Sequence, residues 1–204
     1  MTGHFFRYYK SIKSEYGASR ARLFVIRHAL HMPWSHKWLI YIISLYQKYD
    51  IFEVNYNVVR TKILRNYYSR KLRPGARLAR LLGHYNFLDS VVRFKTMQDI
   101  LAMRPLQLAQ ATGKSGSFYR FSLAQNENFR AEGELTLFLK RDGLKGSLAT
   151  LTFAFGKTEH GAPAAFIGGL QGARGEDSKA QVVEATRDLY GWRPKGAVLD
   201  GFYA

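Results

Sequence analysis

Apolar residues recur at helical spacing in the first half of the chain. The clearest set is Leu78, Leu81, Leu82, Tyr85 and Leu88. At about 100° per residue these positions cluster on one helix face. Pro74 precedes them, and proline suits a first helical turn because its missing N–H is not needed there. We therefore predict a helix that begins at Pro74, with Arg77, Arg80 and His84 along the neighbouring flank.

Two further helices are predicted upstream of Pro74. Val59, Ile63 and Tyr67 lie four positions apart, which indicates a helix within residues 51–72. A shorter helix is predicted over residues 34–48. The first half of the chain is therefore expected to be helical.

From residue 118 onward, apolar and polar residues alternate with a period of two, which is typical of strands. The predicted inner faces are Tyr119, Phe121 and Leu123, then Leu135, Leu137 and Leu139, then Ala149, Leu151, Phe153 and Phe155. The turn residues Arg141-Asp142-Gly143 join the second and third strands as an antiparallel hairpin. A fourth strand is expected over residues 164–171, after the break at Gly161-Ala162-Pro163.

A final helix is predicted to begin at Ser178. Gln181 follows three positions later, which is a capping-box pattern. The predicted inner face consists of Val182, Val183, Thr186, Leu189 and Tyr190. Gly191 followed by Pro194 is expected to end the helix. The fold class is thus α+β, with a helical N-terminal part followed by a mainly antiparallel sheet with a capping helix.

Charge divides the chain unevenly. Through Gln110 there are 19 basic and 5 acidic residues, and from Ala111 onward 12 basic and 10 acidic residues. We therefore separate a basic helical region, 1–110, from an α/β region, 111–204, which can form one compact unit with the first. The basic excess attracts phosphate-rich surfaces, so an anionic membrane is the first partner to expect and nucleic acid the second. Nothing identifies a protein partner.

A run of basic residues without an acidic one defines the candidate lipid or phosphate contacts. It comprises Arg60, Lys62, Arg65, Arg70, Lys71, Arg73, Arg77 and Arg80. The chain has no cysteine, and no signal-peptide pattern is evident at its start. The longest apolar run, 38–46, is about half of what a bilayer crossing needs. We expect a cytoplasmic protein that binds peripherally to the inner membrane.

Two blocks of sequence resemble a known family. The first is Arg60-Thr61-Lys62-Ile63-Leu64-Arg65-Asn66-Tyr67-Tyr68 with Leu82-Gly83-His84-Tyr85-Asn86-Phe87-Leu88. The second is Phe166-Ile167-Gly168-Gly169-Leu170-Gln171-Gly172 with Ala185-Thr186-Arg187-Asp188-Leu189-Tyr190-Gly191-Trp192-Arg193-Pro194-Lys195. With these, the chain resembles the VirK/YbjX family of proteobacterial proteins. Similar proteins run well beyond the Arg193-Pro194-Lys195 segment, so the usual C-terminal part is expected to be lacking.

The resemblance implies a virulence-associated factor in envelope maintenance, with a role in tolerance of cationic antimicrobial peptides. It implies no catalytic residues and no cofactor. The leading hypothesis is therefore a peripheral binder of anionic lipid. Two alternatives stay open: an acyl-CoA-dependent acyltransferase-like enzyme, and an RNA-binding post-transcriptional factor, although no recognisable nucleic-acid motif accompanies the basic residues.

The enzyme alternative has its own candidate residues. Gly168, Gly169, Gln171, Gly172 and Arg174 precede the Ser178 helix, and strand, glycine loop and helix is an order that can hold the phosphates of a coenzyme A thioester. A purely structural turn is the favoured interpretation, because the spacing matches no established phosphate motif.

Candidate acid–base residues complete the enzyme alternative. Glu132 and Glu134 are predicted to point to one side of a strand, and His84 titrates near neutral pH. A solvated pair of carboxylates and a packed histidine are the simpler interpretations. His28, His31 and His36 lack a nearby carboxylate or cysteine, so we predict no metal site.

Overall fold

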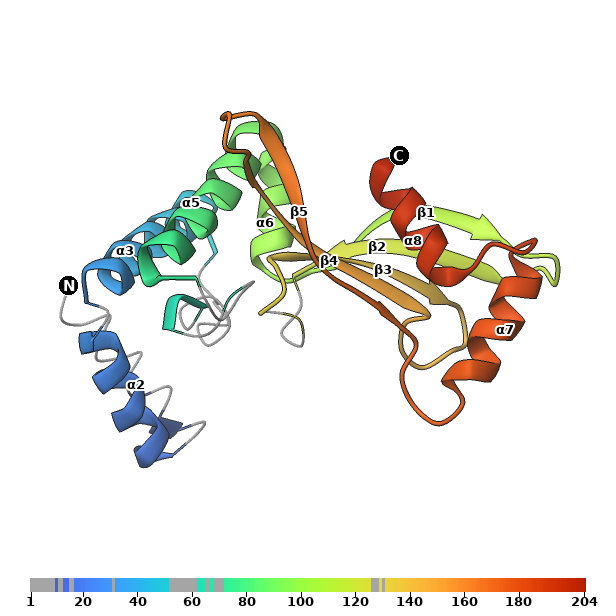
Figure 1. The fold of residues 1–204 in the computed structure, drawn as a ribbon, viewed down its shortest axis with the longest axis horizontal. Coiled ribbons are helices and arrows are strands. Elements are labelled where there is room, and N and C mark those ends of the chain that lie inside the picture. Colours follow the sequence, from blue (N-terminus) through green and yellow to red (C-terminus); the bar gives the residue numbers. More distant parts are fainter. Residues whose placement is uncertain are drawn as a thin grey trace. The chain divides into compact units, whose positions relative to one another are not determined.

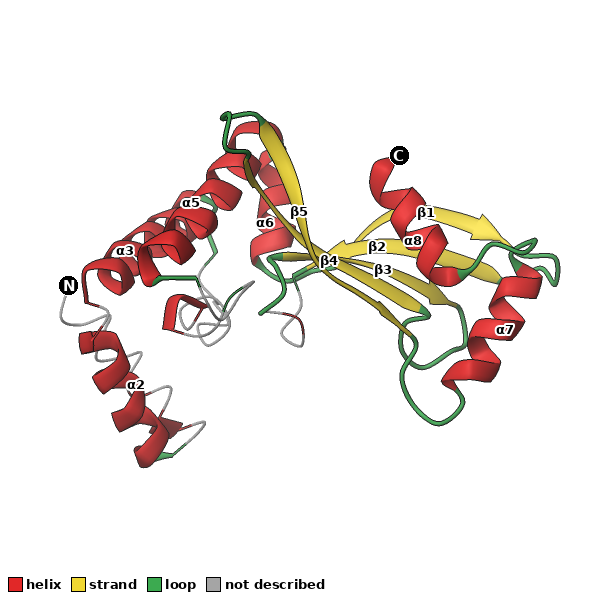
Figure 2. Cartoon of the chain, in the orientation of Figure 1, coloured by secondary structure: helices red, strands yellow, loops and turns green. Residues whose placement is uncertain are grey.

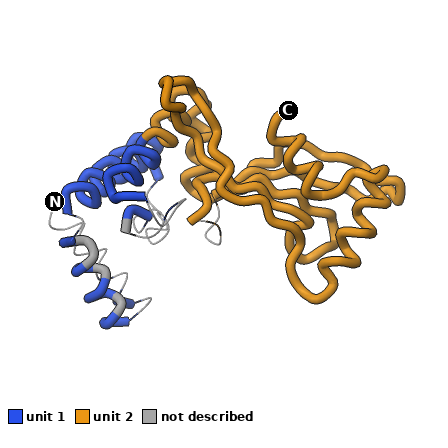
Figure 3. Tube along the Cα trace, in the orientation of Figure 1, with its two compact units in different colours: residues 1–82 blue, residues 83–204 orange. Residues whose placement is uncertain are grey.

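The computed structural model describes residues 10, 13–14, 17–30, 32–51, 62–64, 67, 72–125, 129 and 131–204. The chain divides into two compact units, 1–82 and 83–204, shown in different colours in Figure 3. The boundary falls within helix α5 (Pro74–Val91).

The first unit is helical wherever it is described in regular structure. It contains α2 (Ala18–Leu30), α3 (Met32–Lys48), a 3₁₀ turn (Lys62–Leu64) and the first turns of α5. Helix α3 buries Ser35, Trp38, Ile42, Leu45 and Tyr46, whose spacing defines one helix face. The predicted helices at 34–48 and from Pro74 are confirmed. Most of the helix predicted over 51–72 lies outside the described residues.

The second unit contains a five-stranded antiparallel sheet in sequential order, β1-β2-β3-β4-β5 (Figures 1 and 2). Its elements are α6 (Phe94–Leu101), β1 (Leu106–Thr112), β2 (Phe118–Ala124), β3 (Leu135–Arg141), β4 (Ala149–Lys157), β5 (Pro163–Gly172), α7 (Ser178–Asp188) and α8 (Pro194–Tyr203). The α+β class and the predicted hairpin between β3 and β4 are confirmed. The change from helix to strand lies between α6 and β1, and the sequence division at residue 110, which was drawn from charge, falls within β1.

Alternation places the core of the second unit on one sheet face. Leu137 pairs with Leu151 and Leu139 with Ala149, and all four are buried. Helix α8 packs on this face: the Phe202 and Phe153 ring centroids are 4.8 Å apart. Helix α7 reaches the same face through Tyr119 and Arg141.

Two details of the predicted final helix are wrong. Asp177 is the N-cap of α7 and its side chain makes no capping hydrogen bond, so the capping box at Ser178 is not formed. Val183 and Tyr190, predicted to face inward, are exposed, whereas Ala185, Asp188 and Leu189 are buried. The carboxylate of Asp188 turns inward because its hydrogen-bond partners lie there. Gly191 and Pro194 follow the end of α7 at Asp188 as expected, and Pro194 also begins α8.

Candidate functional site

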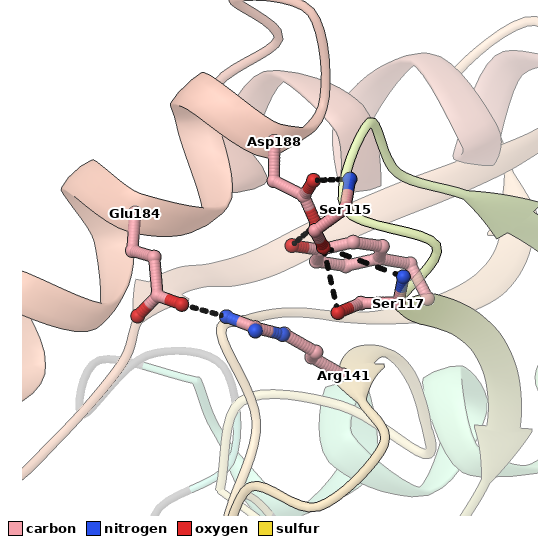
Figure 4. A network of polar contacts seen from close by, with 6 residues as sticks. Ser115, Ser117, Arg141, Glu184 and Asp188 are labelled. Atoms are coloured by element: carbon pink, nitrogen blue, oxygen red, sulfur yellow. Dashed lines mark hydrogen bonds and ion pairs between the residues drawn. The ribbon is translucent and has the colours of Figure 1, made fainter.

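Asp188 joins the end of α7 to the turn between β1 and β2 (Figure 4). Its carboxylate accepts hydrogen bonds from the Ser115 backbone N–H at 2.6 Å, the Ser115 hydroxyl at 3.0 Å and the Tyr119 hydroxyl at 2.7 Å. A Cβ on Gly113 would lie 2.2 Å from Asp188 Oδ2, so only glycine leaves room for the carboxylate. Sequence reasoning missed this cluster.

Electrostatics follow from these contacts. The Ser115 N–H, with the Tyr119 hydroxyl, holds the pKa of Asp188 below its ordinary value. Burial, together with the bond to Asp188, raises the pKa of Tyr119 to about 12. Arg141 pairs with Glu184 of α7 at 2.5 Å beside the cluster. The cluster therefore contains an ionised carboxylate and a protonated phenol at neutral pH.

An open depression of about 1040 Å³ runs along α7 beside this cluster. Its charged lining mixes the two signs: three basic residues, Lys114, Lys179 and Arg187, and four acidic ones, Glu176, Asp177, Glu184 and Asp188. Because the acidic residues outnumber the basic ones, the depression does not favour an anionic ligand. We assign the Asp188 cluster a structural role, which is to fix α7 on the sheet.

The structure brings several of the sequence-predicted enzyme residues together. Gln171 donates from Nε2 to both carboxylate oxygens of Glu132, at 2.8 and 3.0 Å. Arg174 donates in turn to the side-chain oxygen of Gln171. A Cβ on Gly169 would overlap Glu132 Oε2, so the carboxylate of Glu132 uses the space that the glycine leaves on β5. Glu132 thus occupies the position over Gly169.

The glycines do not form a loop. Gly168, Gly169 and Gly172 lie within strand β5, where Gly169 and Gly172 pair with β4, and neither the predicted phosphate loop nor the structural turn is present at these positions. The pairing shifts register between Thr152 and Phe153, opposite Gly168, which is a β-bulge. The connection to α7 begins only after Gly172. Binding of a coenzyme A thioester stays a prediction without the loop geometry that motivated it.

Glu134 has different partners from Glu132. Tyr85 donates its hydroxyl hydrogen to Glu134 Oε2 at 2.7 Å, and Gln125 donates to the Tyr85 oxygen at 3.0 Å. Glu134 and Tyr85 are buried. Between the two glutamates, a Cβ on Gly133 would lie 2.6 Å from the Phe153 carbonyl oxygen. The carboxylates of Glu132 and Glu134 are therefore held by separate contacts. Gly133 lies between them in the sequence, and its backbone is packed closely against β4.

His84 is fully buried, and its ring stacks on Phe155 with an interplanar angle of 7°. Its Nδ1 accepts a hydrogen bond from the Phe155 backbone N–H at 3.0 Å, so the neutral ring carries its proton on Nε2. To act as a general base at Nδ1, His84 would first have to give up this bond. A catalytic role for His84, Glu132 or Glu134 stays a prediction.

The predicted lipid contacts differ in exposure. Lys62 and Arg77 are buried, Arg80 is half-buried and Arg73 is exposed. Arg60, Arg65, Arg70 and Lys71 lie outside the described residues. Burial removes Lys62 and Arg77 from direct contact with a surface, so among the described members of this set Arg73 and Arg80 are the ones that can reach one.

Helices α2 and α3 form a second basic surface, which the sequence prediction did not include. No acidic residue lies between Glu15 and Asp50, a segment that contains both helices. Arg22, Lys37 and Lys48 are exposed on them. Large apolar side chains are exposed on the same helices, among them Leu30 and Met32. Within the described ranges, no helix combines the length and apolarity that a membrane crossing requires.

Comparison with known proteins identifies relatives without an assigned activity. A family model described as "Protein of unknown function (DUF535)" matches residues 13–204. The chain is 30% identical over 154 residues to "Uncharacterized protein YbjX" of Escherichia coli (strain K12), a match that covers 72% of this chain and 46% of that protein. The chain thus spans less than half the length of this relative. No solved structure matches. The resemblance to the VirK/YbjX family is confirmed.

Proposed function

The chain belongs to the DUF535 family, and from that premise we propose that it is an envelope-maintenance factor that binds anionic lipid peripherally. In this role it supports tolerance of cationic antimicrobial peptides, as the resemblance to the VirK/YbjX family implies. The family description names no activity, so support for lipid binding comes from the residues of this chain.

One observation carries the proposal: the acid-free helices α2 and α3 expose basic and large apolar side chains together. Arg22 and Lys37 are exposed, and Arg73 adds a third exposed cation in the same unit. Near an anionic membrane each such residue contributes about 1 kcal/mol. Without acidic neighbours, these cations are not neutralised by carboxylates on their own helices.

The apolar side chains favour lipid over nucleic acid. Nucleic acid would accept the cations through its phosphates, but most of its accessible surface is a charged backbone. A bilayer offers both an anionic headgroup layer and an apolar boundary beneath it. The exposed side chains of Leu30 and Met32 therefore find a matching environment at a membrane that a nucleic acid does not offer.

Vesicle flotation tests the proposal. We expect the protein to float with phosphatidylglycerol-containing vesicles at physiological salt and to remain unbound with neutral phosphatidylcholine vesicles. Excess single-stranded RNA is added in a parallel series as a competitor. Equal recovery with both vesicle types contradicts anionic-lipid binding. If excess RNA removes all of the protein from the vesicles, the nucleic-acid alternative is favoured instead.

A further inference from the structure

Helix α2 exposes a continuous apolar stripe. Leu23, Ile26 and Leu30 are 48%, 56% and 72% exposed, and their spacing of three and four positions places them on one helix face. Ala21, on the opposite side of the helix, is completely buried. The small residue therefore faces the protein, and the three large residues face away from it.

Among the side chains of α2 that the structure describes, this arrangement is the reverse of an ordinary surface helix. An amphipathic helix of a globular protein turns its large apolar residues toward the core. Single exposed apolar residues are common on protein surfaces, but an ordered stripe of them marks an interaction site. In α2 the burial of Ala21 shows that the helix already has a packed side, so the stripe is available to something else.

Further exposed apolar residues follow the stripe closely in the sequence. Met32 follows Leu30 closely in sequence, and Met32 and Trp34 at the start of α3 are both exposed. Tryptophan is enriched where a membrane meets water, because its ring is apolar and its N–H is polar. Arg22 is exposed beside Leu23, and Lys37 lies one turn beyond Trp34.

The positive charge of α2 and α3 indicates which kind of partner can cover this surface. A second copy of the chain would bring its own acid-free basic helices against these, and like charges would repel. An anionic bilayer supplies negative charge at the headgroups and an apolar layer just below them. We propose that α2 lies in the plane of an anionic membrane, with Leu23, Ile26 and Leu30 inserted into the acyl boundary. This inference rests on the proposed function and specifies the element that enters the lipid.

The absence of cysteine from the chain allows a direct test. Ile26→Cys is labelled with an environment-sensitive nitrobenzoxadiazole dye, and Val183→Cys, an exposed apolar position of α7, is the matched control. With phosphatidylglycerol vesicles we expect a blue shift of the dye at position 26, and quenching by lipids that carry a nitroxide on the acyl chain. The dye at position 183 is expected to show neither effect.

Replacing the stripe provides a second measurement. The triple variant Leu23→Gln, Ile26→Gln and Leu30→Gln keeps residues that suit an exposed helix, and circular dichroism checks its folding. We expect its vesicle partitioning to fall roughly tenfold or more, because apolar area no longer leaves water on binding. Val183→Gln is expected to partition like the wild type.

The outcomes separate the two proposals. Flotation of the wild type without a blue shift at position 26 overturns insertion of α2 and leaves lipid binding standing. Failure of the wild type to float overturns both. A blue shift that appears with rising protein concentration and no vesicles means that a second copy covers the stripe, which also overturns insertion. Equal blue shifts of the dye at positions 26 and 183 would also overturn insertion of α2, because they would report unspecific contact with the vesicles.

Discussion

At the scale of single residues, Asp188 fixes the end of α7. Its side chain accepts hydrogen bonds from Ser115 and Tyr119, and its backbone carbonyl accepts one from the Lys114 N–H at 3.0 Å. Tyr119 is fully buried, so the loss of its hydroxyl removes one hydrogen bond to a charged acceptor without exposing the ring.

Tyr119→Phe is expected to lower the free energy of unfolding by about 1.5 kcal/mol, the usual contribution of a hydrogen bond to a charged group. Urea denaturation at neutral pH measures the change. Tyr203→Phe, at an exposed position, serves as the control and should have almost no effect. Equal stabilities of the two variants would show that the bond to Asp188 contributes little.

The lowered pKa of Asp188 predicts an acid dependence of stability. The folded-state pKa of Asp188 is below the unfolded value of 3.8. The stabilisation by ionised Asp188 is therefore complete above pH 3.8, and it is lost as the pH falls through the folded-state pKa. We expect Asp188→Asn to be less stable than the wild type at neutral pH and to lose less stability on acidification. Denaturation curves measured from neutral to strongly acidic pH give the free energy of unfolding of both proteins. If the difference between these free energies does not become smaller at acidic pH, the prediction is contradicted.

A side chain at position 133 is expected to clash with strand β4, which the sequence pattern does not reveal. A Cβ there would meet the Phe153 backbone carbonyl, which cannot move without disturbing β4. Gly133→Ala is expected to destabilise the protein by roughly 2 kcal/mol. Gly83→Ala is the matched control, because a Cβ there meets nothing closer than 4.0 Å, and in helix α5 it should be neutral or slightly stabilising. Thermal denaturation of both variants compares them, and similar melting temperatures would refute the steric explanation.

At the scale of elements, three helices end in the same way. The backbone N–H groups of Ile51, Arg104 and Gly191 each bond the carbonyl five residues earlier, at the ends of α3, α6 and α7. The preceding residue has positive φ in each case: Asp50 at 52°, Met103 at 59° and Tyr190 at 56°. These are Schellman ends, and glycine is the residue that usually occupies this left-handed position.

Tyr190→Gly is therefore expected to stabilise the protein by about 1 kcal/mol, because glycine adopts positive φ without a Cβ penalty. Tyr190→Ala removes the same exposed ring but keeps the Cβ, so it should give no such gain. Chemical denaturation distinguishes the two variants. If alanine and glycine change the stability equally, backbone strain at Tyr190 is not the cause.

The elements with clear periodicity were predictable from the sequence, and those determined by distant contacts were not. Strands β2 to β4 carry large apolar residues at alternate positions, which made them recognisable, and residues on the other face, such as Thr136 and Thr152, are buried as well. Strand β1 was not predicted, because most of its side chains are exposed and no alternation marks it. The fourth strand predicted over 164–171 is confirmed as β5, and pairing with β4 keeps the glycines that also suggested a loop within this strand.

The candidate site was predictable only in part, for the same reason. Gln171 and Arg174 were chosen together as candidate cofactor contacts and Glu132 separately as an acid–base candidate, and the structure places the three in one hydrogen-bonded chain. The contact between Ser115 and Asp188 was missed, because 73 positions separate the two residues and the family block that contains Asp188 assigns it no partner. Inward placement of Asp188 also explains why an apolar pattern misassigned the inner face of α7.

At the scale of the whole molecule, the distribution of charge carries the functional proposal. The formal net charge is +16, and the segment between Glu15 and Asp50 contributes only positive residues. A general attraction to anions would depend on net charge alone. Binding through α2 and α3 depends instead on where that charge is located, and this distinction can be measured.

The decisive measurement compares two charge reversals of equal size in vesicle flotation at physiological salt. Arg22→Glu with Lys37→Glu alters the exposed surface of α2 and α3, and Lys179→Glu with Arg187→Glu alters α7 by the same net charge. We predict that the first pair lowers partitioning onto phosphatidylglycerol vesicles by roughly a hundredfold, since each lost attraction contributes about 1 kcal/mol and each new repulsion adds to the loss. The second pair should bind nearly as the wild type does. Equal losses for both pairs would contradict the account, because binding would then follow net charge and not the basic helices.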